Sequence, residues 1–459
     1  MEKKKMSVNR GQWGSGLGFI LAAAGSAVGL GNIWRFPYLA AKYGGGIFLL
    51  VYIALVITFG LFLMITEIAI GRKTGLSPIG AYTKLGKKFK FVGIIASFVA
   101  FIIIPYYSVI GGWVMKYFAA YMSGQHTALA QDSFFTNFIS SGTEPIVWQF
   151  IFILLTTAVV IFGVEKGIEK ASKILMPFLF LLLIGLAVYS ATRPGVLEGI
   201  KIYFMPDFSK FSMELLLAAM GQMFYSMSLA MGIMITFGSY VKKDENLEKS
   251  TFNIALFDTI VAILAGFIIV PSFYVFSNGA SDTMKAGPGL MFGVLPQVFE
   301  SFGNATATSI FGAVFFLLVF FAAITSSISL MEAVVSTISD QLKINRKIAT
   351  VIACACALVL SLFPSLGYSA LSSVRILGLE ILDFMDFISN SLLMPFGALM
   401  TCIIVGYFIT PKAIVDEIRL SSTFKYEKLY SAVIKFFGPA IVIAVLVSSV
   451  LNTFGVISL

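Results

Sequence analysis

Four carboxylates lie inside otherwise apolar stretches of this 459-residue chain: Glu67, Asp258, Glu332 and Asp386. An ionisable side chain within a membrane-embedded helix is energetically expensive, so each is a candidate for binding a charged species. Asp258 is the strongest candidate, because its own stretch is apolar and a small-residue break in the preceding stretch lies near it. The structural alternative for Asp258 is a hydrogen bond between helices, and Glu67 and Glu332 could equally brace interrupted helices.

Side-chain oxygens near these carboxylates could complete cation sites. Hard cations such as sodium prefer oxygen ligands, and an unwound helix offers free backbone carbonyls. Asn32, Ser226 and Asp258 could contribute to one site, and the hydroxyls of residues 325–327 to a second. A Ser/Thr cluster in a membrane helix also commonly joins helices through hydrogen bonds, and that alternative stays open for residues 325–327.

Catalytic and metal-binding patterns are missing from the sequence. The one histidine, His126, falls in a polar connection, and Cys354, Cys356 and Cys402 fall in apolar stretches where a thiol acts as a small hydrophobic group. The glycines at 14, 16 and 18 follow no strand, so they do not form a dinucleotide-binding loop. With no catalytic triad or phosphate-binding loop, an enzyme is the weakest interpretation.

Composition indicates the elements that must position these residues. Hydrophobic residues make up 58% of the chain, charged residues only 12%, and the mean hydropathy is +0.93. A soluble domain carries about 25% charged residues, so the recurring apolar runs predict membrane-spanning helices. We predict an all-α membrane protein with eleven spans, at about residues 15–37, 41–69, 91–122, 147–163, 174–192, 213–239, 253–276, 309–337, 348–364, 382–408 and 431–455.

The net charge of +9 arises largely from basic residues in alternate connections. Those connections fall near residues 72–90, 166–173, 242–249, 343–347 and 412–428. Because cytoplasmic loops are enriched in Lys and Arg, we expect these connections and the N-terminus to be cytoplasmic and Leu459 to lie outside. This placement indicates a multi-pass protein of the plasma membrane, such as a bacterial inner membrane, and no nucleic-acid partner.

Two spans are interrupted at mid-membrane depth by small and polar residues, at 25–32 and at 226–232. The interruptions lie five spans apart, which is typical of five-plus-five inverted-repeat transporters with broken helices 1 and 6. We therefore expect a cytoplasmic segment at 1–12, a first repeat at 13–193 and a second repeat at 194–410, with an outer lid at 277–308. Residues 411–459 would form a peripheral eleventh span.

Long motifs in these segments resemble the neurotransmitter:sodium symporter family, above all its eleven-span bacterial carriers of hydrophobic and aromatic amino acids. The resemblance covers nearly the whole chain in the family's order. It rests on GSAVGLGNIWRFPY (25–38) with GGG (44–46), LMITEIAIGR (63–72), PYYSVIGGW (105–113), GQMFYSMSLAMG (221–232), GSYVKKD (238–244), FFAAITSSISLME (320–332) and LDFMD (382–386).

This resemblance implies two sodium sites and one substrate site. The first sodium site would use Ala27, Asn32, Ser226 and Asp258, and the second Gly25, Val28, Ala322, Thr325 and Ser326. The substrate carboxylate would meet the Leu30 and Gly31 amides and the Tyr107 hydroxyl. The complete expected substrate site is Ser26, Ala27, Leu30, Gly31, Ile103, Tyr107, Tyr225, Ser226, Ser228, Met231, Ser326 and Leu330.

The resemblance also implies gates at both ends of the site. Arg35 with Asp386 would form the outer gate above a Tyr107 and Tyr225 lid, and the inner gate would comprise Arg10, Trp13, Tyr240 and Asp340. Asp258 stands where many members have Asn, so a fixed carboxylate would replace chloride, which we do not expect to be required.

The resulting interpretation is a sodium-coupled importer of a hydrophobic, preferably aromatic, amino acid. Gly29 occupies the position where amine carriers have an aspartate, and Met231 leaves room where a phenylalanine would narrow the site. A proton-coupled carrier of the same fold is the nearest alternative, because Asp258 could titrate, and an ion channel is a more distant one. The sequence leaves the sodium stoichiometry and the oligomeric state open.

Overall fold

The computed structural model describes residues 11–280 and 284–457. Within these ranges, nine helical segments are long and apolar enough to cross a membrane, and a bent pair adds a tenth. The predicted sixth span consists of two short helices, α12 (Met213–Ser226) and α13 (Ile233–Gly238), neither of which is long enough to count singly. All eleven predicted spans therefore correspond to helical segments, and the predicted fold class is confirmed.

The first half of the chain contains the first five of these segments. The bent pair is α1 (Gly16–Ala27) followed by η1 (Gly31–Arg35) and α2 (Phe36–Lys42), with an angle of 53° between its halves. The next are α3, η2 and α4 (Gly46–Leu55, Val56–Gly60, Leu61–Thr74), η3 and α6 (Lys87–Phe89, Lys90–Met122), α9 (Thr143–Val160), and η4 and α10 (Val164–Glu169, Lys170–Ala191). Shorter connecting helices are α5 (Pro78–Leu85), α7 (His126–Leu129) and α8 (Asp132–Ser140).

The second half begins with α11 (Val196–Phe204), η5 (Phe208–Lys210) and the broken α12–α13 pair, and continues with α14 (Leu247–Phe276). The expected lid region contains η7 (Gly289–Val294) and α15 (Leu295–Glu300). It is followed by α16 (Ala305–Leu342), α17 (Arg346–Leu366), and α18, η8, α19 and η9 (Ile381–Asp386, Phe387–Leu393, Met394–Ile403, Ile404–Phe408). The last elements are α20 (Pro411–Ile418), α21 (Glu427–Ala432), η10 (Val433–Phe437) and α22 (Gly438–Thr453).

Polar residues fix where several helices begin. Ser15, Ser212, Asn246 and Asn304 each accept a hydrogen bond from a backbone N–H of the first turn of α1, α12, α14 and α16, respectively. Such N-caps satisfy backbone donors that would otherwise lack a partner. The sequence thereby sets the register of the helices that carry the two breaks and Asp258.

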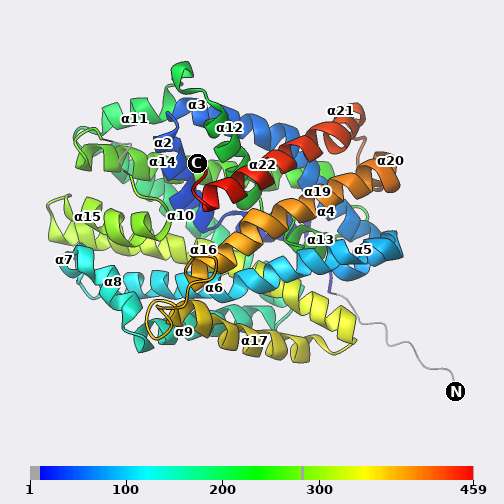
Figure 1. The fold of residues 1–459 in the computed structure, drawn as a ribbon, viewed down its shortest axis with the longest axis horizontal. Coiled ribbons are helices and arrows are strands. Elements are labelled where there is room, and N and C mark those ends of the chain that lie inside the picture. Colours follow the sequence, from blue (N-terminus) through cyan, green and yellow to red (C-terminus); the bar gives the residue numbers. More distant parts are fainter. Residues whose placement is uncertain (1–10, 281–283, 458–459) are drawn as a thin grey trace.

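The short helices gather at the two ends of the molecule, as Figure 1 shows. Helices α5, α20 and α21 lie at the right of the view, while α7, α8, α11 and α15 lie at the left. The right-hand end carries the basic connections at 72–90 and 412–428, and we call it the basic end. Between the two ends, α16 packs against α1, α6 and α10, so the broken first segment is enclosed by long helices.

Both interruptions are real backbone breaks. Helix α1 ends at Ala27 and is followed by Val28, whose ψ of 100° is extended. The second break contains Ser228, Ala230 and Gly232 with φ of 52°, 60° and 73°. A left-handed conformation is unfavourable for Ser and Ala, so surrounding contacts must hold it. Glu67 supplies one of them, because its Oε1 accepts a hydrogen bond from the Ala230 amide at 2.9 Å. Glu67 therefore braces a broken helix, one of the two roles open to it from the sequence.

Candidate functional site

The two breaks lie side by side near the centre of the molecule. The Ser228 hydroxyl donates to the Ser26 carbonyl at 2.9 Å and lies 3.3 Å from the Ser26 hydroxyl. On the other side of the breaks, Gln222 Nε2 donates to the Gly31 carbonyl at 3.1 Å. These contacts join α12 and its break to α1 and η1, and they bring backbone amides and carbonyls of both segments to one place.

A first cluster of oxygens surrounds Asp258, which is completely buried on α14. Asn32 Nδ2 donates to Asp258 Oδ1 at 2.7 Å, and the Ser226 hydroxyl lies 2.9 Å from both carboxylate oxygens. The Tyr52 hydroxyl donates to Oδ2 at 3.3 Å. Within the described ranges no Lys, Arg or His forms an ion pair with this carboxylate. A buried anion without a basic partner is suited to a bound cation.

A second cluster of oxygens lies between α1 and α16. The Ser326 hydroxyl is 3.3 Å from the Gly25 carbonyl oxygen and 3.2 Å from that of Val28. Thr325 Oγ1 is 3.1 Å from the Ala322 carbonyl. A Cβ added to Gly25 would lie 3.1 Å from Thr325 Cβ, so glycine allows the two helices to approach this closely. Neutral carbonyl and hydroxyl oxygens at this spacing match the ligand preference of a monovalent hard cation.

A small cavity of about 40 Å³ lies between the clusters. All twelve residues expected to form the substrate site line it, together with Gly29, Asn32 and Ile233. The Tyr107 hydroxyl is buried at its edge, close to Ser326 and the Leu30 backbone, but makes no hydrogen bond of good geometry to a described residue. The cavity is small, and the Tyr107 hydroxyl offers it a polar group that the described residues leave without a hydrogen-bond partner.

A larger cavity of about 390 Å³ lies beyond Tyr225, which lines both cavities. Arg35 and Asp386 both line it, as expected for an outer gate, yet no ion pair joins these two described residues. Arg35 instead lies over the Tyr225 ring, 5.7 Å from its centroid. Asp386 Oδ1 accepts hydrogen bonds from the Tyr106 hydroxyl at 3.2 Å and from Asn390 Nδ2 at 2.5 Å. Arg35 and Asp386 are thus apart from each other at the larger cavity, each with a different partner.

The side of the site toward the basic end is closed. Trp13, 3% exposed, donates from its indole to the Phe237 carbonyl at 3.0 Å and from its backbone to the Tyr240 carbonyl at 3.2 Å. Tyr240 donates to Glu332 Oε1 at 2.6 Å, and Arg346 Nη1 donates to the same oxygen at 2.7 Å.

Two further residues were expected at the inner gate. Asp340 accepts a hydrogen bond from the Ser77 amide at 2.9 Å, whereas Arg10 lies outside the described residues. The structure therefore brings Trp13 and Tyr240 together and places Asp340 against Ser77.

Sequence reasoning missed several partners of these groups. Tyr52, Tyr106 and Asn390 lie within apolar or aromatic stretches, where nothing marks one hydroxyl or amide as the partner of a particular carboxylate. Arg346 was assigned to a basic connection because of its place next to Lys343 and Lys347. Its pairing with Glu332, fourteen residues earlier, follows from the antiparallel turn between α16 and α17 and gives Glu332 a bracing role.

The paired breaks, the cavity between them, the closed side toward the basic end and the Tyr225 boundary with the outer cavity define a membrane transporter of the inverted-repeat class. Two comparisons with known proteins refine this class. The model of the sodium:neurotransmitter symporter family matches residues 10–141 and 131–456. A crystal structure of MhsT in complex with L-phenylalanine superposes with a TM-score of 0.85 at 38% identity, covering 96% of this chain and all of that one.

Named relatives agree with this match. An uncharacterized sodium-dependent transporter of Bacillus subtilis, YhdH, is 36% identical over 97% of this chain and 98% of its own length. An uncharacterized sodium-dependent transporter of Haemophilus influenzae is 34% identical over 96% of this chain and 98% of its own length. A sodium- and chloride-dependent GABA transporter of Drosophila melanogaster is 29% identical over 74% of this chain and 40% of its own. The chain belongs to the sodium:neurotransmitter symporter family and is a multi-pass, sodium-dependent membrane transporter.

Proposed function

We propose that this symporter imports a hydrophobic, preferably aromatic, amino acid together with two sodium ions by alternating access. The observation that carries the proposal is the buried Asp258 carboxylate beside a cavity lined by two broken helices. A carboxylate held only by neutral donors favours a cation, and free backbone groups at helix breaks can bind both ends of a zwitterion. Chloride is not required in this proposal, because Asp258 supplies the negative charge.

The two sodium ions are assigned to the two oxygen clusters. The first would be bound by the Ala27 carbonyl and the side-chain oxygens of Asn32, Ser226 and Asp258. The second would be bound by the Gly25, Val28 and Ala322 carbonyls and the hydroxyls of Thr325 and Ser326. Supporting this assignment, Ser326 already lies within 3.3 Å of carbonyl oxygens on α1, so one small shift could convert those hydrogen bonds into ion coordination.

The substrate would lie with its carboxylate toward the Leu30 and Gly31 amides and the Tyr107 hydroxyl. Tyr107 supports this orientation, because its buried hydroxyl borders the cavity without a good protein partner. The substrate side chain would face Ile103, Ser228, Met231 and Leu330, among other lining residues. The L-phenylalanine in the related MhsT complex favours an aromatic side chain here as well.

Alternating access would use the two closures in turn. Tyr225 separates the central cavity from the 390 Å³ outer cavity, and approach of Arg35 to Asp386 would seal it. Opening toward the basic end would require Trp13 to leave Phe237 and Tyr240. We assign the basic end to the cytoplasm, with the N-terminus inside and the C-terminus outside, as the positive-inside rule favours for a bacterial inner membrane.

The repeat organisation is part of this proposal. Residues 13–193 and 194–410 would form the two inverted repeats, with 277–308 as the outer lid, 1–12 as a cytoplasmic segment and 411–459 as a peripheral span. The two breaks fall at the start of the two halves, in α1–η1 and α12–α13, which supports this division. Each half would then contribute one broken helix to the central site.

We expect the double variant Thr325→Ala with Ser326→Ala to lose concentrative uptake, because two hydroxyl ligands of the second sodium ion disappear together. Uptake of labelled L-phenylalanine into proteoliposomes under an inward sodium gradient measures this. Ser327→Ala is the matched control, since Ser327 is adjacent but lies 3.1 Å from the Thr156 hydroxyl instead. Undiminished uptake by the double variant would remove the second-site assignment.

We expect Met231→Phe to shift the substrate preference from aromatic toward smaller aliphatic amino acids by about tenfold, as differences of 1–3 kcal/mol in a hydrophobic pocket permit. A phenylalanine ring cannot move aside as an unbranched methionine can. Competition against labelled L-phenylalanine by L-leucine and L-alanine gives the ratio, and Met231→Leu, which conserves volume, is the control. If glycine, alanine or a monoamine outcompetes every aromatic amino acid in the native protein, the substrate class is wrong.

A further inference from the structure

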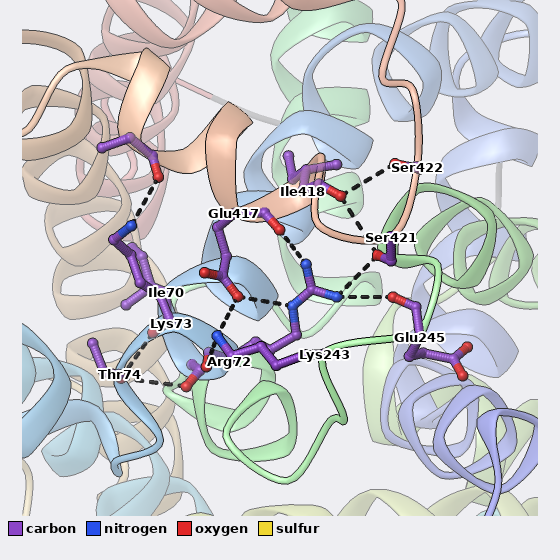
Figure 2. A network of polar contacts seen from close by, with 12 residues as sticks. Ile70, Arg72, Lys73, Thr74, Lys243, Glu245, Glu417, Ile418, Ser421 and Ser422 are labelled. Atoms are coloured by element: carbon purple, nitrogen blue, oxygen red, sulfur yellow. Dashed lines mark hydrogen bonds and ion pairs between the residues drawn. The ribbon is translucent and has the colours of Figure 1, made fainter.

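A buried ionic cluster lies at the basic end, away from the transport site, and joins three segments that are distant in sequence (Figure 2). Its centre is Arg72, in the last turn of α4, whose side chain is 0% exposed. Nε donates to Glu417 Oε1 of α20 at 3.0 Å, and Nη2 donates to the Glu417 carbonyl. Nη1 donates to the Glu245 carbonyl at 2.8 Å and to the Ser421 hydroxyl at 3.1 Å. One guanidinium thus binds two separate connections.

A second cation strengthens the same link. Lys243, in the connection that follows α13, donates to Glu417 Oε1 at 2.6 Å and to the Arg72 carbonyl at 3.0 Å (Figure 2). The Lys243 side chain is 57% exposed, whereas that of Glu417 is 5% exposed. The connection at 239–246 is therefore attached to both α4 and α20 through the buried Arg72 and Glu417 and through the more exposed Lys243.

The opposite face of this connection forms the closed inner side of the site. The Tyr240 carbonyl accepts from the Trp13 backbone, and the Glu245 carboxylate accepts from the Ser250 hydroxyl at 2.6 Å. A Cβ added to Gly16, the first residue of α1, would lie 2.3 Å from Glu245 Oε2. The beginning of α1 thus packs directly against a connection whose other face is bound by Arg72 and Glu417.

From this arrangement we propose that Arg72 and Glu417 are positioning residues for alternating access. Their contacts fix the connection at 239–246 to α4 and α20. The beginning of α1 can then pack against this immobile connection and close the inner side of the site. Removing the cluster would weaken this docking without touching the central cavity, and it would shift the population toward the conformation open at the basic end. The inference rests on the alternating access in the proposed function, but it does not depend on which amino acid is carried.

Two cysteine reporters, each added singly to a background with Cys354, Cys356 and Cys402 replaced by Ala, test this. The first reporter is Val241→Cys, at a residue that lines a cavity between α1 and the connection at 239–246. The second is Ser449→Cys, at a residue that lines the outer cavity. Labelling by a membrane-impermeant maleimide is followed in vesicles of both orientations, in sodium and without substrate. With Glu417→Gln or Arg72→Lys, we expect the reactivity of Cys at 241 to rise and that at 449 to fall, each about fivefold.

A third variant separates positioning from stability. Arg72→Met with Glu417→Leu leaves no unpaired buried charge, and apolar replacement of a buried pair commonly preserves folding. We expect it to shift both reporters in the same direction as the single variants, because the guanidinium that binds the Glu245 carbonyl is absent. Glu427→Gln, which removes the exposed ion pair with Arg419 in the same region, should change neither reporter.

Three results would overturn the inference. The first is that, in the double apolar variant, the maleimide reactivity of both reporter cysteines equals that in the protein with native Arg72 and Glu417. The second is a rise in the reactivity of the cysteine at 241 with no fall at 449. The third is no change in any variant. Because labelling is measured without substrate, an error in the proposed amino acid would leave these readings intact and would appear only in the uptake assays.

Discussion

Replacing Asp258 with Asn is expected to abolish sodium-driven uptake in chloride-free buffer or to make uptake depend on chloride. The substitution keeps the shape of the side chain but removes the one negative charge in the first oxygen cluster. A buried charge interaction is worth several kcal/mol, so we expect the apparent sodium affinity to fall by about a hundredfold or more. Uptake of labelled L-phenylalanine as a function of sodium, with chloride or gluconate as the anion, measures both effects.

Tyr52→Phe is the matched control for this prediction. It removes the hydrogen bond that the neutral Tyr52 hydroxyl donates to Asp258 Oδ2 but keeps the carboxylate charge, so uptake should fall modestly and remain independent of chloride. A native protein that already requires chloride would contradict the assignment of Asp258 as the fixed anion. Unchanged sodium affinity in Asp258→Asn would show that the carboxylate is a structural acceptor between helices, the alternative that the sequence left open.

Replacing Gly29 with Asp should reduce amino-acid uptake by about a hundredfold, because the new carboxylate would compete with that of the substrate for the same amides and sodium ion. A Cβ at this position would lie 2.9 Å from Ser326 Oγ and 3.3 Å from the Tyr107 hydroxyl. The new carboxylate would therefore enter the cavity at the place proposed for the substrate carboxylate. Gly29 does not have a positive φ, so an L-residue is compatible with its backbone.

Gly29→Asn separates charge from volume, since it fills the same space without a charge. We expect Asn to retain clearly more uptake than Asp, and Gly29→Asp to gain measurable binding of a monoamine such as phenylethylamine in a competition assay. Equal losses for Asp and Asn, with no amine binding, would show that the position tolerates no side chain at all. Gly29 would then no longer favour an amino acid over an amine as the substrate.

Much of the architecture follows from the sequence because the membrane restricts what an apolar segment can do. The eleven spans were predictable from their length and hydropathy, and the breaks from glycine and serine at mid-span. The twelve expected substrate-site residues line one cavity. Their identification depended on long motifs, since helical periodicity alone does not indicate which faces of α1, α6, α12 and α16 meet.

What the sequence could not provide is the choice of partner for each buried polar group. Arg72 and Arg346 lie in or beside basic connections of the sequence, yet each pairs with a buried glutamate on another element. Nothing local distinguishes such an arginine from one that faces lipid headgroups. The positive φ of Ser228 and Ala230 was equally hidden, because tertiary contacts such as that of Glu67 hold conformations that these residues rarely adopt alone.

The same limit applies to conformation. Arg35 and Asp386 were predicted to act as a gate, and the structure has both residues on the outer cavity without an ion pair between them. Whether Arg35 and Asp386 form an ion pair depends on the conformational state of the transporter. One sequence encodes every state of the transport cycle, so it does not indicate in which state the pair forms. Residue types thus indicate which groups can meet, while the packing of α1 against α16 and the connection at 239–246 determines which do.

In the proposed function, sodium drives the accumulation of an amino acid. The purified protein in proteoliposomes should concentrate labelled L-phenylalanine when an inward sodium gradient is imposed. It should not do so with a potassium gradient, or with an inward proton gradient in sodium-free buffer. Concentrative uptake driven by the proton gradient alone, or equal uptake in sodium and potassium, would contradict sodium coupling and favour a proton-coupled carrier or a channel.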